Sequence, residues 1–372
     1  MRYKVLDSWR GICALLVVVY HAADQNTIGQ SGFVRGSFLF VDFFFVLSGF
    51  VMCAAYADRI RNARQFRVFM LRRTGRVWPL HAFMLLAFLG LELTKLALSS
   101  YPGAQFVNKP FTATMAPSGF LPSLLLVHAM GVLPSLTWNI PSWSIAAEYW
   151  VYAVFALLAW AVGSRAPWIG LFVAFGASTV LVATSTHFMD ATYDLGFVRC
   201  LYGFFVGVAL FRAHTRSHTR SRTDGPKYGT IVELVSVAVA YAFVTFTHNT
   251  VYAYASPLVF ASVILVYADS NGAVSRLLAT RWPLRMGTLS YSIYMTHVFL
   301  LGTVGMVGKA VGKFATGHQL NWSGFDLLPS SVESFGVLFG FIGLVVVVSH
   351  FTYTYVEVPG QRVFNRLAEQ LT

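Results

Sequence analysis

Apolar segments of membrane-spanning length recur along the whole chain, and they constrain the fold more than any other feature. A helix needs about 20 consecutive, mainly apolar residues to cross the hydrocarbon core of a bilayer. Because lipid offers backbone groups no hydrogen-bond partners, such segments must form helices. The sequence therefore predicts one all-α, polytopic membrane domain over residues 1–372, with about ten helices. The predicted helices cover 6–24, 37–57, 77–98, 143–162, 167–186, 196–212, 229–247, 252–269, 287–308 and 333–356.

The composition agrees with a membrane protein. Hydrophobic residues make up 56% of the chain and charged residues only 11%, whereas about a quarter of an average globular chain is charged. The net charge of +12 suggests nucleic acid as a partner, but the arginines gather in short loops between apolar segments. That distribution is typical of cytoplasmic loops in membrane proteins. We therefore expect membrane lipids around the chain and no nucleic acid.

The basic loops also predict an orientation. If they all lie in the cytoplasm, both termini are cytoplasmic and the number of crossings is even. Ten crossings fit, provided that the short apolar piece at 119–133 is re-entrant or interfacial and does not cross. The connection 99–142 then faces outward. The basic loops are residues 58–76, 212–227 and 276–285, together with Arg362 and Arg366 near the C-terminus.

The N-terminal segment bears on processing of the chain, and the three cysteines bear on disulfide and metal binding. Arg2 and Lys4 before an apolar stretch leave a cleaved signal peptide as an alternative for the first segment, but Asp7 and Arg10 interrupt the approach to its apolar part, which favours a retained first span. The three cysteines lie in apolar segments without paired spacing. This pattern predicts neither a disulfide framework nor a metal site.

The first span carries a polar stripe. Arg10 and His21 are 11 residues apart, close to three turns of an α-helix, so they share a face about 16 Å apart along the axis. Asp7, one turn before Arg10, lies on the same face and can pair with it. Ionisable groups at bilayer depth usually face a protein interior and mark function. The structural alternative is an arginine that reaches lipid headgroups and a histidine that caps the helix.

Two later spans carry a carboxylate each. Asp42 lies near the start of the second span, in "FVDFFFVLSGF", and Glu148 lies in the fourth, in "PSWSIAAEYWVY". With the orientation above, both are expected near the outer side, close in depth to His21. Either can orient an imidazole that acts as a base. For Asp42 the alternative is an acid that the helix dipole favours near an N-terminus.

Two further groups complete the candidates. Arg72, Arg73 and Arg76 are helical neighbours at the basic edge of the third span, and guanidinium groups bind phosphate oxygens in pairs. The alternative is the ordinary positive charge of a cytoplasmic edge. In a late span, Tyr294 and His297 lie on roughly one face with Ser290 and are candidates for the site. The alternative is a histidine that is simply packed between helices, which is common.

Taken in order, six stretches resemble the acyltransferase-3 family of integral membrane enzymes, which O-acetylate bacterial surface polysaccharides and related acceptors. The stretches are "LDSWRGICALLVVVYH", "FVDFFFVLSGF", "RRTGRVWPL", "PSWSIAAEYWVY", "LSYSIYMTH" and "YVEVPGQRV". The resemblance implies about ten helices around a central cavity and an acyl-CoA donor, usually acetyl-CoA, used from the cytoplasm. It also implies an acceptor that is often outside a bacterial inner membrane.

The resemblance implies roles for single residues. Arg10 and His21 match the family's essential Arg and His, and Arg73 and Arg76 match its Arg-x-x-Arg motif. Asp42 and Glu148 match acids of two further motifs. Family members with a fused extracytoplasmic esterase-like domain are known, and this chain is expected to be a stand-alone form.

Residues and resemblance together give a mechanistic hypothesis. The nucleotide end of acyl-CoA docks at Arg72, Arg73 and Arg76, and Arg10 steers the donor. His21 acts as general base on an acceptor hydroxyl, or as an acyl relay, and Asp42 or Glu148 orients it. The acceptor is a glycan, a lipid-linked sugar or a small hydroxyl-bearing molecule. A transporter with a buried His/Asp/Glu proton relay and a scaffold protein remain alternatives. The residues expected to contact substrate are Trp143, Ser144, Tyr152, Tyr294 and His297.

Overall fold

The computed structural model describes residues 3–23, 28–100, 106, 108–220, 229–269, 272–316 and 332–371. Within these ranges the chain forms helices joined by turns, and no strand occurs among them. The all-α prediction is confirmed. Parts of the outward connection 99–142 and of the basic loop 212–227 lie outside the described residues.

Fourteen α-helices follow one another along the described chain, and a π-helical turn at Tyr353–Glu357 joins the last two. Short 3₁₀ turns precede α3, α5, α7 and α10. The helices are α1 (Lys4–Ala22), α2 (Gly32–Arg35), α3 (Phe40–Tyr56), α4 (Ala63–Leu98), α5 (Phe120–Leu124), α6 (Ser142–Val162), α7 (Ala166–Thr184), α8 (Gly196–Arg220), α9 (Thr230–Thr247), α10 (Ser256–Asp269), α11 (Ala273–Leu278), α12 (Arg281–Thr316), α13 (Val332–Thr352) and α14 (Val358–Glu369).

The predicted spans coincide with these helices. Nine segments of the described chain are long and apolar enough to cross a membrane. The remaining predicted span, 167–186, corresponds to α7. Its apolar part, Trp168–Thr184, is somewhat shorter than the nine other segments. The apolar piece at 119–133 contains only the five-residue α5 followed by turns. It is too short to cross as a helix, in agreement with the prediction.

The third span is much longer than the predicted range 77–98. Helix α4 runs for 36 residues from Ala63. It begins there because Asn62 caps the helix by accepting a hydrogen bond from the Gln65 N–H at 2.9 Å,. At 1.5 Å per residue, α4 is about 54 Å long and extends beyond a hydrocarbon core of about 30 Å. The arginine motif therefore lies on a continuous helix that runs through the bundle.

Helix α1 crosses α12 closely, and this crossing sets the position of the polar stripe. A Cβ atom added to Gly11 would lie 2.6 Å from the backbone nitrogen of Gly287. Small residues at such a crossing let two membrane helices approach until their backbones touch. Helix α1 also contacts α3, and Asp7 and Arg10 of its polar stripe line a cavity inside the bundle.

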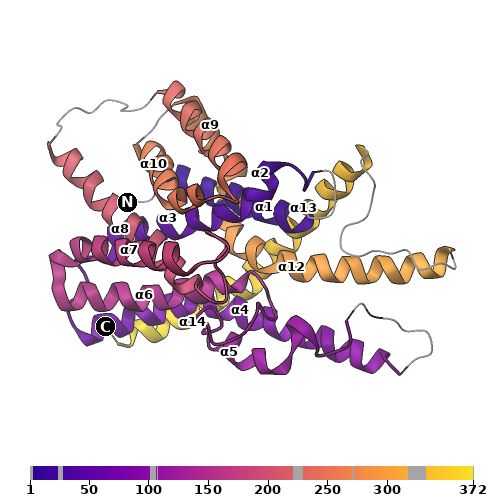
Figure 1. The fold of residues 1–372 in the computed structure, drawn as a ribbon. Helices are drawn as coiled ribbons and strands as arrows, with labels where there is room; N and C mark the ends of the chain where they lie inside the picture. The colour runs from indigo at the N-terminus through magenta and orange to yellow at the C-terminus, as the bar shows by residue number, and fades with distance from the viewer. Residues whose placement is uncertain are drawn as a thin grey trace.

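Figure 1 shows α1 beginning and α14 ending on the left side of the bundle. The link from α3 to the start of α4 lies on the same side, and it carries Arg59, Arg61 and Arg64. We call this side the basic end. Two chain ends at one end of a bundle agree with an even number of crossings. That the basic end faces the cytoplasm is still a prediction.

Candidate active site

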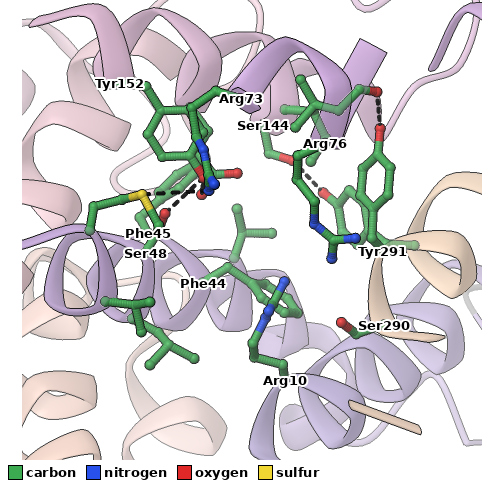
Figure 2. Close-up of a pocket in the computed structure, with 18 of the residues that line it drawn as sticks. Arg10, Phe44, Phe45, Ser48, Arg73, Arg76, Ser144, Tyr152, Ser290 and Tyr291 are labelled. Atoms are coloured by element: carbon green, nitrogen blue, oxygen red, sulfur yellow. Dashed lines mark hydrogen bonds between the residues drawn. The ribbon is translucent and has the colours of Figure 1, made fainter. Parts of the chain in front are cut away.

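A cavity of about 220 Å³ lies inside the bundle, between α1, α3, α4, α6 and α12. We call it the arginine cavity, because Arg10, Arg73 and Arg76 line it. Figure 2 shows the side chains of Arg10, from α1, and of Arg73 and Arg76, from α4, pointing into the same space. Two acids, Asp7 and Glu148, line it as well. Residues that are 142 positions apart in the sequence, such as Arg10 and Tyr152, thus share one pocket.

Arg10 extends into this cavity from the polar stripe of α1 (Figure 2). Its guanidinium lies within electrostatic reach of Arg76, Asp7 and Glu148. Within the described part of the chain, no hydrogen bond or ion pair to the Arg10 side chain occurs. The expectation that Arg10 faces the protein interior is confirmed, and the alternative in which it reaches lipid headgroups does not hold.

Arg73 is held by aromatic rings. Its guanidinium carbon lies 5.5 Å from the ring centre of Tyr56 and 5.8 Å from that of Tyr152. It donates a long hydrogen bond of 3.5 Å to the Tyr56 hydroxyl. Its Nε atom is buried and without a hydrogen-bond partner, and no carboxylate of the described chain pairs with it. Cation–π contacts stabilise the charge and leave it available to an anion.

Arg76 has a carboxylate partner that the sequence interpretation missed. It forms an ion pair with Glu357, which is only 1% exposed. The second oxygen of Glu357 accepts a hydrogen bond of 2.8 Å from Ser292. Glu357 ends the π-helical turn, a local widening of the helix that is frequent at functional sites. Glu357 is therefore a buried partner that orients Arg76.

Arg72 does not share the cavity of its neighbours. Successive residues of a helix point about 100° apart, so Arg72 leaves α4 in another direction. It lines a second cavity, together with Arg59 and Arg64. The predicted cluster of three arginines is thus divided between two cavities.

Glu148 belongs to the arginine cavity and lies apart from His21. Its Oε1 accepts a hydrogen bond of 2.7 Å from the Tyr152 hydroxyl, and the Ser48 hydroxyl, 3.0 Å away, donates in turn to Tyr152. Because α6 begins at Ser142, Glu148 lies about 9 Å below the start of the helix. Glu148 thus shares a cavity with Arg10 and not with His21, and no described contact supports a role of Glu148 in orienting the imidazole.

Asp42 likewise does not orient His21. It is fully buried and forms a bidentate ion pair with Arg199, with Nε–Oδ1 at 2.8 Å and Nη2–Oδ2 at 3.0 Å. Ser256 donates a further hydrogen bond of 2.9 Å to Oδ2. The pair joins α3, α8 and α10. Arg199 was missed in the sequence, although an arginine inside the apolar span 196–212 was a sufficient signal.

The residues predicted to contact substrate are also divided. Ser144, Tyr152 and Tyr294 line the arginine cavity, and the Ser144 and Tyr294 hydroxyls lie 2.8 Å apart. Trp143 instead covers the Arg199 guanidinium, 5.4 Å from its ring centre, and so supports the buried ion pair. His297 pairs with His21.

The two histidines form a hydrogen-bonded pair. His21 Nδ1 lies 3.0 Å from the Val17 carbonyl oxygen and 3.2 Å from His297 Nε2. His297 is fully buried, and its Nδ1 lies 3.3 Å from the Ile293 carbonyl oxygen. Carbonyl oxygens only accept, so both Nδ1 atoms carry the proton. The single His21 Nδ1–H is then shared between the Val17 carbonyl oxygen and His297 Nε2, and the lone pair of a neutral His21 is on Nε2.

This histidine pair lies beyond the far wall of the arginine cavity. Tyr294 lines the cavity, and its ring centre is 5.9 Å from that of His297. His21 itself is not among the cavity's lining residues. Arg10 and His21, about 16 Å apart on one helix, therefore mark two successive regions of the interior, the arginine cavity toward the basic end and the histidine pair toward the opposite end.

Comparisons with known proteins show which family the chain is similar to. A family profile described as "Acyltransferase domain" matches residues 3–354. Acyltransferase MdmB of Streptomyces mycarofaciens is 24% identical over 98% of this chain and 93% of its own length. BcsY of Komagataeibacter xylinus, which carries the name of a membrane-bound transacylase, is 23% identical over 98% of this chain and 84% of its own length.

A third relative, protein 2 in the picA locus of Rhizobium radiobacter, is 29% identical over 50% of this chain and 95% of its own length. No solved structure matches the chain. The family profile covers nearly all of the helices described above, and it favours an acyltransferase over a transporter or a scaffold protein. The chain is an integral membrane acyltransferase and belongs to the acyltransferase-3 family.

Proposed function

We propose that this acyltransferase moves an acyl group, expected to be acetyl, from acyl-CoA to a hydroxyl group of a glycan or glycan-like acceptor. One observation carries the proposal. Arg10 and Arg73 line a buried cavity and, within the described chain, have no ion-pair partner. Acyl-CoA is an anion with several phosphates, and its binding at the basic end would bring negative charge close to these arginines. A cavity with apolar walls and a few charged groups suits a long, narrow ligand arm.

The arginines of the cavity have separate tasks in this proposal. Arg76 is already neutralised by Glu357 and is held rigidly by it. Arg73 is stacked on aromatic rings and binds the donor. Arg10, on the helix that also carries His21, steers the donor so that its thioester end reaches the histidine pair.

The chemical step uses His21 Nε2. As the acceptor hydroxyl oxygen attacks the thioester carbonyl carbon, Nε2 takes the hydroxyl proton. A C–O bond forms, the C–S bond breaks, and CoA leaves as a thiolate that receives the proton from the imidazolium. In the relay variant, Nε2 attacks the thioester carbonyl carbon first, the C–S bond breaks and CoA leaves as a thiolate. The acyl group then passes from the imidazole to the acceptor oxygen, and the hydroxyl proton goes to the thiolate. Both variants need the lone pair on Nε2, which the contacts of Nδ1 with Val17 and His297 favour.

The two regions of the interior predict two entrances. The donor is expected to enter from the basic end, which the orientation proposal places in the cytoplasm of a bacterium. The acceptor is expected at the opposite end, near the histidine pair. It is a glycan, a lipid-linked sugar or a small hydroxyl-bearing molecule.

A transfer assay with radiolabelled acetyl-CoA tests this proposal on membranes that contain the protein. His21→Ala should lower transfer of label to the glycan and lipid-linked fractions by at least about 100-fold, the usual contribution of a general base. His248→Ala is a matched control, because His248 Nδ1 makes the same contact with the carbonyl oxygen one turn earlier, at 3.2 Å. It should transfer label as the unmodified protein does. Equal transfer by His21→Ala and the unmodified protein would contradict the assignment.

A further inference from the structure

A second cavity, of about 370 Å³, lies at the basic end beside the first one. We call it the outer basic cavity. Arg59, Arg64 and Arg72 line it, and Tyr56 and Phe69 form part of its wall. The three arginines come from the link after α3 and from the first turns of α4. None of them lines the arginine cavity.

The outer basic cavity carries positive charge that the described chain does not neutralise. No carboxylate lines it. Asp58, next to Arg59, pairs instead with Arg212 at 3.0 Å. Arg64 donates to the carbonyl oxygen of Leu371, which carries no net charge. For Arg59 and Arg72, no ion pair is found among the described residues. Three guanidinium groups around one hollow suit a ligand with more than one phosphate.

The two cavities share a wall that is one layer of side chains thick. Tyr56 and Phe69 line the outer basic cavity, and the guanidinium of Arg73, which lines the arginine cavity, lies on both of their rings, 5.5 and 5.8 Å from the ring centres. A ligand with phosphates at one end and a thin arm at the other can therefore occupy both cavities by passing this wall.

We propose that the outer basic cavity binds the nucleotide phosphates of acyl-CoA, whereas the arginine cavity receives the pantetheine arm, which carries the thioester toward the histidine pair. This inference rests on the proposed function. It separates the roles of neighbouring arginines. Arg72, together with Arg59 and Arg64, binds phosphates, and Arg73 and Arg10 bind the pantetheine arm. Anionic lipid headgroups carry the same phosphate chemistry, so the experiment must distinguish them from the donor.

Equilibrium binding to the purified protein in phosphatidylcholine nanodiscs provides the test, with labelled acetyl-CoA and labelled acetyl-pantetheine as probes. The double variant Arg59→Gln/Arg72→Gln should weaken acetyl-CoA binding at least about tenfold, as expected when hydrogen bonds between charged groups are lost. Binding of acetyl-pantetheine, which has no nucleotide, should not change.

Adenosine 3′,5′-bisphosphate should displace acetyl-CoA from the unmodified protein. Arg67→Gln is the matched control, because Arg67 is exposed on the same helix and lines neither cavity; it should bind both probes normally.

The outcomes separate this inference from the proposed function. If the double variant binds both probes normally, or loses both in parallel, the outer basic cavity does not bind the nucleotide. If the variant differs only in nanodiscs that contain phosphatidylglycerol, and equally for both probes, the arginines contact lipid headgroups and the inference is wrong. If the unmodified protein binds neither probe, acyl-CoA is not the donor, and the proposed function fails together with the inference.

Discussion

Two kinds of arginine lie inside this bundle, one fully buried and one half-buried beside a cavity, and they differ in how many of their hydrogen-bonding groups the protein pairs. Arg199 is 1% exposed, pairs with Asp42 through two nitrogens, and is covered by Trp143. Arg73 contacts aromatic rings and one tyrosine hydroxyl, and its Nε has no partner. The first arginine needs nothing from outside the protein. The second leaves hydrogen-bonding capacity directed into a cavity.

The difference has an energetic basis. A buried charge costs several kcal/mol unless it is paired and hydrogen-bonded. At Arg199 the protein supplies the whole set of partners from three helices, which suits a structural role. At Arg73 and Arg10 the aromatic faces and nearby acids offset only part of that cost. The remainder is available to an anionic ligand, which suits a binding role. The predictions below test this contrast.

The largest effect on stability is expected at the satisfied arginine. Arg199→Gln leaves the Asp42 carboxylate buried without its partner, which should lower the free energy of unfolding by about 3–5 kcal/mol. Thermal unfolding of the purified protein in detergent measures this change. Asp42→Asn combined with Arg199→Gln should regain part of the loss, because no unpaired charge is left. A double variant that unfolds no later than the single variant would show that the ion pair is not the source of the stability.

The next largest effect is expected at the open arginine, and it should appear in binding rather than in stability. Arg73→Gln removes a charge for which the described chain offers no counter-ion, so the unfolding temperature should change little. Affinity for acetyl-CoA should fall about 10- to 100-fold, the usual range for losing a hydrogen bond to a charged group. Isothermal calorimetry and thermal unfolding on the same sample check both statements. A variant that loses stability as Arg199→Gln does, with normal donor binding, would remove the contrast.

A smaller effect is expected at His297, which acts through His21. His297→Leu removes one of the two acceptors of the His21 Nδ1–H and leaves the Val17 carbonyl oxygen. The value of kcat should fall by up to about tenfold, as expected for one net hydrogen bond. His297→Gln places an amide oxygen near the same point and should keep more activity. KM for acetyl-CoA should stay the same in both, because His297 does not line the arginine cavity. A change in KM equal to that in kcat would indicate that His297 contacts the donor site.

The local patterns of the sequence predicted the helices and the contents of single helix faces correctly. The spacing of Arg10 and His21 follows from the period of one helix, so it placed both on an inward stripe. The spacing of Arg73 and Arg76 likewise brought them to one cavity. These are properties of neighbouring turns, and no knowledge of how helices pack is needed to infer them.

Contacts between helices could not be predicted in this way. Asp42 and Arg199 are 157 residues apart, and Arg76 and Glu357 are 281 apart. Which helices become neighbours depends on packing, for example on the close crossing at Gly11 and Gly287. For this reason Asp42 and Glu148 were assigned to His21, whereas their partners are Arg199 and Tyr152. The partner of His21 was among the candidates, as His297, but only packing brings the two rings together.

The most direct test of the account is donor binding in a protein that cannot turn over. His21→Ala should bind labelled acetyl-CoA as tightly as the unmodified protein, because His21 lies outside the arginine cavity. Adding Arg73→Gln to that variant should weaken binding at least about tenfold. Tight binding that survives Arg73→Gln, or binding that disappears with His21→Ala alone, would contradict the separation of donor cavity and catalytic histidine on which the account depends.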